Sequence, residues 1–372
     1  MKKFIPVCEP NIGKKEISYV NDAVTSGWVS SNGKYIGRFE KEFAKFCHRK
    51  YAEAVCNGTV ALHVALLAIG IKKGDEVLVS NITFIATANA VKYIGAKPVL
   101  VDVESDTLNI DVEKIENKIT KKTKAIMVVH LYGHPCDMDK IMKIAKKHNL
   151  FVIEDAAEAH GSFFKKQICG SFGDISCFSF YGNKVITTGE GGMCLTDDPE
   201  LHKKIKLLRG QGMTEDRRYW HEVVGYNYRM TNMQAALGCA QMERIVNFIK
   251  AKRENAKLYK KLLKSEPQII LPIEKPYAKS NFWMFTILLG ENLTGKRDEI
   301  MEKLKTMGIE SRVVFYPLSD MPVYLESGEK LLVSKKMAYR GITLPSSTKL
   351  TRSDIKYICD SLKKIISNIK KI

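Results

Sequence analysis

Short apolar runs alternate with helical patterns from about residue 52 to 196, and this alternation limits the possible folds more than any other feature. The apolar runs have the length of buried strands, and the segments between them repeat apolar residues at helical spacing. The expected strands are 52–55, 76–80, 98–103, 125–131, 151–154, 175–180 and 192–195, and the expected helices are 61–69, 86–94 and 138–147. This order predicts an α/β domain with a mainly parallel sheet covered by helices on both faces.

The pattern changes after residue 232. Apolar residues at helical spacing predict one long helix from 232 to about 263, which leaves the first domain. A strand is expected at 282–289, a helix at 297–307, and an amphipathic C-terminal helix that starts at the capping pair Thr351 and Asp354. We therefore expect a large domain over residues 1–245 and a small α/β domain over residues 246–372.

Composition excludes several classes of function. The net charge is +18, but the basic residues are spread along the chain without interleaved aromatics, which argues against a nucleic-acid partner and allows attraction of a diphosphate. The nine cysteines are odd in number and lack CxxC spacing, so we expect reduced structural thiols and no metal site. We find no signal peptide and no apolar stretch near the ~20 residues of a membrane span, and expect a cytoplasmic protein.

Three polar features follow predicted strands, where the ligand crevice of such a sheet lies. Asn57-Gly58-Thr59 opens a helix, and its free amides suit a phosphate; an ordinary turn capped by Thr59 is the alternative. Asp155 ends an apolar strand, where a carboxylate needs a partner such as a protonated pyridine nitrogen; a structural role is the alternative. Lys184 follows the strand that contains Ser179 and lies near glycines, so its amine can form a Schiff base with an aldehyde.

Together and in this order, these features resemble one family closely. The stretches at 57–61, 154–160, 178–192 and 225–232 are similar to those of the DegT/DnrJ/EryC1/StrS sugar aminotransferases, and the resemblance covers nearly the whole chain. It implies a pyridoxal 5′-phosphate (PLP) transferase of fold type I, which is the aspartate aminotransferase fold.

The resemblance also implies a role for each matching residue. Lys184 would hold PLP and move the proton, Asp155 would pair with the pyridine nitrogen, and Phe84 would lie over the ring. Gly58, Thr59 and Ser179 would hold the phosphate. Asn227 would reach the phosphate of the other subunit, which implies a homodimer with shared active sites.

Glu158 departs from the pattern, since many relatives have glutamine there, near the 3′ oxygen of the cofactor. A carboxylate facing a phenolate would repel it unless the two share a proton. Glu158 is therefore either protonated in the site or points elsewhere. His160 is a candidate partner for Glu158, or a structural histidine.

A lysine at position 184 favours transamination over sugar 3-dehydration, for which relatives carry histidine there. The expected donor is L-glutamate and the acceptor C4 of a nucleotide-linked 4-keto-6-deoxyhexose. Residues 178–193 and 209–232 are similar to those of relatives that aminate GDP-4-keto-6-deoxymannose. UDP- or dTDP-4-keto-6-deoxyglucose, dehydration and a non-catalytic regulator are the alternatives. The candidate substrate contacts are Arg229, Arg312, Phe315 and Tyr316.

Overall fold

A seven-stranded sheet forms the centre of the protein, which we describe from a computed structural model over residues 4–214, 216–327 and 331–369. Its strand order is β1-β9-β8-β5-β4-β2-β3. The strands are β1 Tyr51–Val55, β2 Glu76–Ser80, β3 Lys97–Val101, β4 Thr123–Val129, β5 Phe151–Asp155, β8 Ile175–Ser179 and β9 Gly192–Thr196. Only β9 runs against its neighbours within this sheet, which confirms the predicted mainly parallel arrangement.

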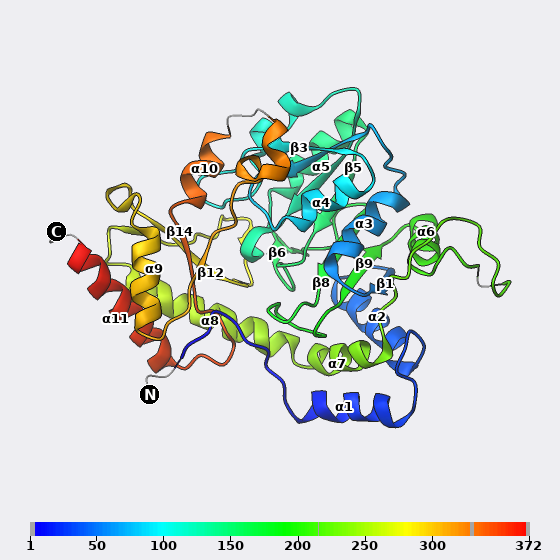
Figure 1. The fold of residues 1–372 in the computed structure, drawn as a ribbon, viewed down its shortest axis with the longest axis horizontal. Helices are drawn as coiled ribbons and strands as arrows, with labels where there is room; N and C mark the ends of the chain where they lie inside the picture. Colours follow the sequence, from blue (N-terminus) through cyan, green and yellow to red (C-terminus); the bar gives the residue numbers. More distant parts are fainter. Residues whose placement is uncertain (1–3, 215, 328–330, 370–372) are drawn as a thin grey trace.

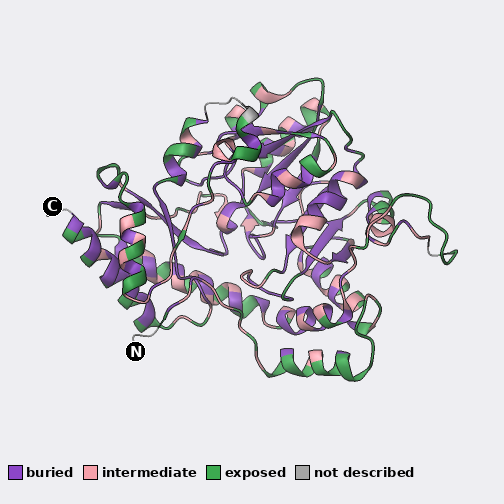
Figure 2. Cartoon of the chain, in the orientation of Figure 1, coloured by how far each residue is buried: buried purple, intermediate pink, exposed green. Residues whose placement is uncertain are grey.

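Helices cover both faces of this sheet, so its strands are largely buried (Figure 2). One face packs against α3 Gly58–Ala68, α4 Ala86–Tyr93 and α6 Pro199–Arg209. The other face packs against α2 Lys34–Phe46, α5 Met138–His148 and α7 Asn232–Met242, and α1 Lys14–Thr25 lies outside α7 (Figure 1). No helix in the described ranges is long and apolar enough to cross a membrane.

The C-terminal part has its own antiparallel sheet of four strands, in the order β10-β12-β14-β13. These strands are β10 Ile269–Ile270, β12 Phe285–Leu289, β13 Arg312–Val313 and β14 Gly341–Leu344. The helices of this part are α8 Ile245–Leu263, α9 Arg297–Thr306, α10 Leu332–Ala338 and α11 Arg352–Ile369. A small third sheet joins β11 Ala278–Lys279, β6 Phe163–Phe164 and β7 Gln167–Ile168. The domain boundary near residue 245 stays a prediction; Ile5, from the N-terminal segment, pairs with Ile309 and packs in the C-terminal core.

The predicted single helix over 232–263 is wrong, because the chain breaks between α7 and α8 at Glu243 and Arg244. The Glu243 carboxylate forms ion pairs with Lys15 and Arg38, and Arg244 Nη1 lies 2.7 Å from Glu16 Oε1. Residues of α1 therefore bind the side chains at the break. Helical periodicity cannot predict these contacts, because the partners are more than two hundred positions apart. The strand expected from residue 282 begins at Phe285, after Phe282 with a positive φ of 50°.

The predicted capping pair of the C-terminal helix is confirmed. The Asp354 amide donates to Thr351 Oγ1 at 3.1 Å, and the Thr351 amide donates to Asp354 Oδ2 at 3.0 Å. Two backbone donors at the start of α11 are thereby satisfied within one turn.

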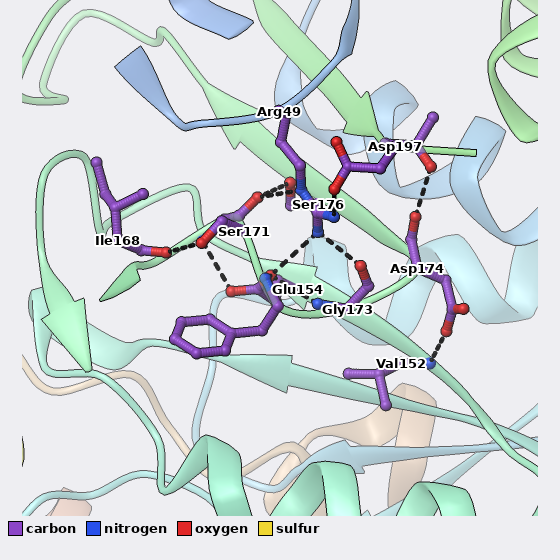
Figure 3. Close-up of polar contacts among 12 residues, drawn as sticks. Arg49, Val152, Glu154, Ile168, Ser171, Gly173, Asp174, Ser176 and Asp197 are labelled. Atoms are coloured by element: carbon purple, nitrogen blue, oxygen red, sulfur yellow. Dashed lines mark hydrogen bonds and ion pairs between the residues drawn. The ribbon is translucent and has the colours of Figure 1, made fainter. Parts of the chain in front are cut away.

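Glu154 anchors the chain beside the end of β5 (Figure 3). Its fully buried carboxylate accepts hydrogen bonds from His130 Nε2 at 3.0 Å and from three backbone amides, those of Gly170, Phe172 and Gly173. Burial raises the pKa of this carboxyl, but the hydrogen bond from His130 and the nearby charge of Arg49 offset it, and the pKa lies below its usual value. Glu154 is therefore a structural carboxylate, ionised in the folded protein.

Arg49 completes this cluster from the connection between α2 and β1. Its guanidinium donates to the carbonyls of Gly170 and Gly173 at 2.9 and 2.6 Å, and it pairs with Asp197 at 2.9 Å. Carbonyls and amides of one turn are thus bound by two buried side chains of opposite charge, which holds that turn next to the end of β5.

We predict that Glu154→Ala lowers the free energy of unfolding by about 3–5 kcal/mol, because four donors and the Arg49 charge lose their buried acceptor. Glu154→Gln should cost less. The folded pKa lies below the unfolded one, so this stabilisation is present above about pH 4.3 and is lost as the pH falls through the folded pKa. Urea unfolding at fixed protein concentration, at pH 7 and pH 4, measures both effects; equal stability of the alanine variant at pH 7 would contradict this role.

Candidate active site

A cavity of about 490 Å³ lies at the carboxyl ends of the parallel strands. It brings together most of the residues predicted as site residues. Those that line it are Gly58, Thr59, Phe84, Asp155, Glu158, Ser179, Lys184, Arg312 and Phe315. These residues come from the central part and from the C-terminal part of the chain, since Arg312 lies in β13 of the four-stranded sheet. The cavity is large enough for a small organic cofactor together with part of a substrate.

Three predicted residues do not line this cavity in the single chain. Asn227 is exposed and forms a backbone bridge with Gly210, and Arg229 is half-buried in a bridge with Val55 of β1. Tyr316 is 40% exposed, and its hydroxyl accepts a hydrogen bond from Arg297 Nη2 at 3.4 Å. The roles given to these residues stay predictions.

Lys184 projects its amine into the cavity from the loop after β8. Its Nζ lies 3.6 Å from Glu158 Oε1 and 3.8 Å from the centre of the Trp283 ring. Burial lowers the pKa of this amine, although the charges of Glu158 and Asp155 act in the opposite direction. A lowered pKa increases the neutral fraction of the amine, which is the form that attacks an aldehyde.

Asp155 is buried at the end of β5, with its carboxylate at the wall of the cavity. Thr87 Oγ1 donates to Oδ2 at 2.8 Å, and the amide of Ala157 donates to Oδ1 at 3.2 Å. Burial raises the pKa of the Asp155 carboxyl, with these two hydrogen bonds acting against it. A carboxylate oriented and buried in this way is suited to bind a cationic ring nitrogen.

Glu158 also lines the cavity, so it does not point elsewhere. The amide of Tyr132 donates to Glu158 Oε2 at 2.7 Å. Burial raises the pKa of Glu158 to about 7, with the charge of Lys184 opposing the rise. Near neutral pH the protonated form of this carboxyl is therefore accessible, as sharing a proton with a phenolate would require.

His160 is not the partner of Glu158. Its buried ring packs against Phe43, Phe178 and Phe180, with centroid distances of 6.1, 5.2 and 5.7 Å. Burial lowers the pKa of His160 to about 3, so it is neutral. Its surroundings are those of a structural histidine.

The start of α3 and the end of β8 meet closely enough to form an anion cradle. Asn57 Oδ1 accepts from the Val60 amide at 3.0 Å, and Gly58 and Thr59 occupy the first turn, whose amides have no partner within the helix. A Cβ at Gly58 would lie 2.7 Å from Ser179 Cβ, so only glycine allows this approach. Amides, hydroxyls and the helix dipole together suit a phosphate.

Three residues around the site are absent from the sequence predictions. Thr87 of α4 does not line the cavity but donates to Asp155, which does. Tyr132 lines the cavity and directly follows the predicted strand 125–131, so its position at a strand end is a usable signal. Trp283 contacts Lys184 from the C-terminal part. No local pattern connects residues about a hundred positions apart, and only the fold brings these two together.

The geometry fits PLP in three places. The amine of Lys184 suits its aldehyde, the buried carboxylate of Asp155 its ring nitrogen, and the cradle of Gly58, Thr59 and Ser179 its phosphate. PLP supplies an electron sink for a substrate carbanion.

Comparison with known proteins agrees with this fit. Residues 10–363 match the model of the DegT/DnrJ/EryC1/StrS aminotransferase family. A GDP-perosamine synthase of Escherichia coli O157:H7 is 50% identical over 98% of this chain and 100% of its own length, and one of Caulobacter vibrioides is 47% identical over 97% and 98%. The solved structure of Helicobacter pylori PseC, an aminotransferase of pseudoaminic acid biosynthesis, has a TM-score of 0.94, 28% identity, and coverage of 98% of this chain and 100% of its own.

Fold and relatives together define a PLP-dependent sugar aminotransferase of fold type I. The chain belongs to the DegT/DnrJ/EryC1/StrS aminotransferase family.

We predict that Asp155→Asn keeps the fold but lowers kcat at least about 100-fold, because an amide does not hold a ring nitrogen protonated as a carboxylate does. Thermal unfolding and steady-state kinetics measure the two effects. Asp198→Asn is the matched control: Asp198 caps α6 far from the cavity, and asparagine caps equally well. Near-normal turnover of the Asp155 variant would show that this carboxylate is structural only.

Proposed function

We propose that this enzyme moves the amino group of L-glutamate to C4 of GDP-4-keto-6-deoxymannose, the reaction that gives GDP-perosamine. The observation that carries the proposal is the similarity to three GDP-perosamine synthases, at 50, 47 and 44% identity over 97–98% of the chain. Relatives tied to other sugar nucleotides are more distant; DesI, solved with its TDP-sugar product, is 29% identical. UDP- and dTDP-4-keto-6-deoxyglucose are therefore the less favoured acceptors.

The residues at the cavity have complementary tasks in this proposal. Lys184 would hold the cofactor, and its amine, once released by the incoming substrate, would move a proton between the substrate carbon and the cofactor in each half of the reaction. Asp155, oriented by Thr87, would keep the ring nitrogen protonated. Glu158 would share a proton with the phenolic oxygen.

Lysine rather than histidine at position 184 supports transamination over dehydration. A proton-transfer group that also binds the aldehyde must have a primary amine. Retention of this amine together with Asp155 and Ser179 argues against a non-catalytic regulator.

The substrate contacts are proposed from residues at the mouth of the cavity. Arg312 lines the cavity, and although its guanidinium pairs with Glu310 at 3.3 Å, its side chain is 45% exposed, so it is accessible to a diphosphate. Phe84 and Phe315 lie 5.9 Å apart at the same mouth, where Phe84 would cover the cofactor ring. We propose Arg229 and Tyr316 as further contacts.

We propose a homodimer in which Asn227 reaches the cofactor phosphate of the other subunit. The segment between α6 and α7 projects away from the rest of the chain (Figure 1). It exposes apolar side chains that water solvates poorly: Tyr219 at 73%, Trp220 at 49% and Val224 at 87%. Exposed Asn227 on the same segment is accessible to a second subunit.

The substrate assignment predicts a higher kcat/KM for GDP-4-keto-6-deoxymannose than for UDP- or dTDP-4-keto-6-deoxyglucose. A site that pairs buried polar groups with guanine leaves them unpaired against a pyrimidine, which can cost orders of magnitude in efficiency. The measurement is a comparison of the three acceptors under saturating glutamate, with product masses as confirmation. A higher value for either pyrimidine nucleotide would overturn the GDP assignment alone.

Shared sites predict complementation between two inactive variants. Lys184→Ala and Asn227→Ala subunits, dissociated and mixed, should recover up to about a quarter of wild-type activity, because random pairing gives half heterodimers and one of their two sites carries neither change. Differently tagged subunits verify that heterodimers form. If verified heterodimers stay inactive, Asn227 does not act across the interface.

A further inference from the structure

Trp283 is fixed at three points between the two sheets. Its amide donates to Asn281 Oδ1 at 2.7 Å, and its indole Nε1 donates to the carbonyl of Asn183 at 2.7 Å. Its own carbonyl accepts from Lys252 Nζ at 3.0 Å. The side chain lines the cavity, yet the residue is only 3% exposed. Such a residue has little freedom to move.

The same indole contacts both the backbone that precedes Lys184 and the amine of its side chain. Its N–H binds the carbonyl of Asn183, the residue before Lys184, and its ring face lies 3.8 Å from Lys184 Nζ. Cys8 Sγ also donates to the Asn183 carbonyl, at 3.3 Å. The backbone where Lys184 begins and the amine where it ends are thus placed by one rigid group.

Lys252 of α8 holds Trp283 in turn. Only 3% exposed, it donates to the carbonyls of Trp283 and Ser346, at 3.0 and 2.9 Å. No ion pair of Lys252 occurs within the described part of the chain. An amine buried without a carboxylate partner is costly, because burial disfavours its charged form and lowers the pKa of Lys252. It connects α8 with the chain segments before β12 and after β14.

We propose that Trp283 is a positioning residue for Lys184, and that Lys252 holds Trp283 in place. An amine released from the cofactor must stay beside the substrate carbon. When this amine is protonated, the face of the Trp283 ring attracts it and keeps it there. The other ionisable groups near Lys184 are Glu158, Asp155, His160 and Cys8. This inference rests on the proposed role of Lys184, and it adds roles for Trp283 and Lys252.

The first test is the rate of the glutamate half-reaction in single turnover, followed by the absorbance of the cofactor. Trp283→Phe keeps a ring face but loses the donor to Asn183, and should slow this step about tenfold; Trp283→Leu loses both and should slow it about 100-fold. PLP content should stay near wild type. The pH at which the absorbance of the lysine-bound cofactor changes should shift in both variants. An unchanged rate and an unchanged titration would overturn the proposal.

Phe282→Leu is the matched control for a buried aromatic of the same segment. Phe282 is 6% exposed, but its ring faces Lys260 Nζ at 4.6 Å rather than Lys184. This change should lower stability and leave the half-reaction rate within about twofold. Lys252→Met, which keeps the apolar stem, should reproduce the slowing of Trp283→Phe; a Lys252→Met protein that folds and reacts at the wild-type rate would contradict its part of the proposal.

A double-mutant cycle separates positioning from a general structural role. In Lys184→Ala, with methylamine supplied as the proton-transfer base, adding Trp283→Phe should change the rescued rate less than about twofold, because Trp283 then has no lysine to place. The same tenfold loss in this background would overturn the proposal. Borohydride reduction of the wild-type holoenzyme, followed by mass mapping of the cofactor adduct, tests the Lys184 assignment itself. A wrong assignment of Lys184 is thereby distinguished from a wrong role for Trp283.

Discussion

The active site depends on the parallel course of β4, β5 and β8. Because the carboxyl ends of parallel strands lie at one edge of the sheet, residues far apart in sequence meet there. Asp155 at the end of β5 and Ser179 at the end of β8 lie on one wall of the cavity. The cluster around Glu154 and Arg49 holds the turn at 170–173 against β5, and thereby supports the strand that carries Asp155.

Burial and charge act in opposite directions on Asp155, Glu158 and Lys184, which are buried at the cavity. Burial raises the pKa of Asp155 and of Glu158 and lowers that of Lys184, so it favours the neutral form of each. The charges of neighbouring groups favour the ionised forms. A charged group bound in the cavity would shift the pKa of all three, which suits a site that moves protons in both directions.

Local patterns were sufficient to predict the central sheet, since strand ends and helix starts are encoded within a few residues. Lys184, Asp155 and the turn at Gly58 are predictable in this way, because each lies at the end of a buried strand or within five residues after it. The break at Glu243 and the contact of Trp283 with Lys184 are not, because their partners lie about a hundred or more positions away.

Adjacent carboxylates in β5 belong to different environments. Side chains alternate between the two faces of a strand, so Glu154 enters the nest of amides while Asp155 faces the cavity. A shift of β5 by one residue would put either Ile153 among the amides and Glu154 at the cavity, or Asp155 among the amides and Ala156 at the cavity. The donors around Glu154 therefore fix the register of β5, and with it the carboxylate that the strand presents to the cavity.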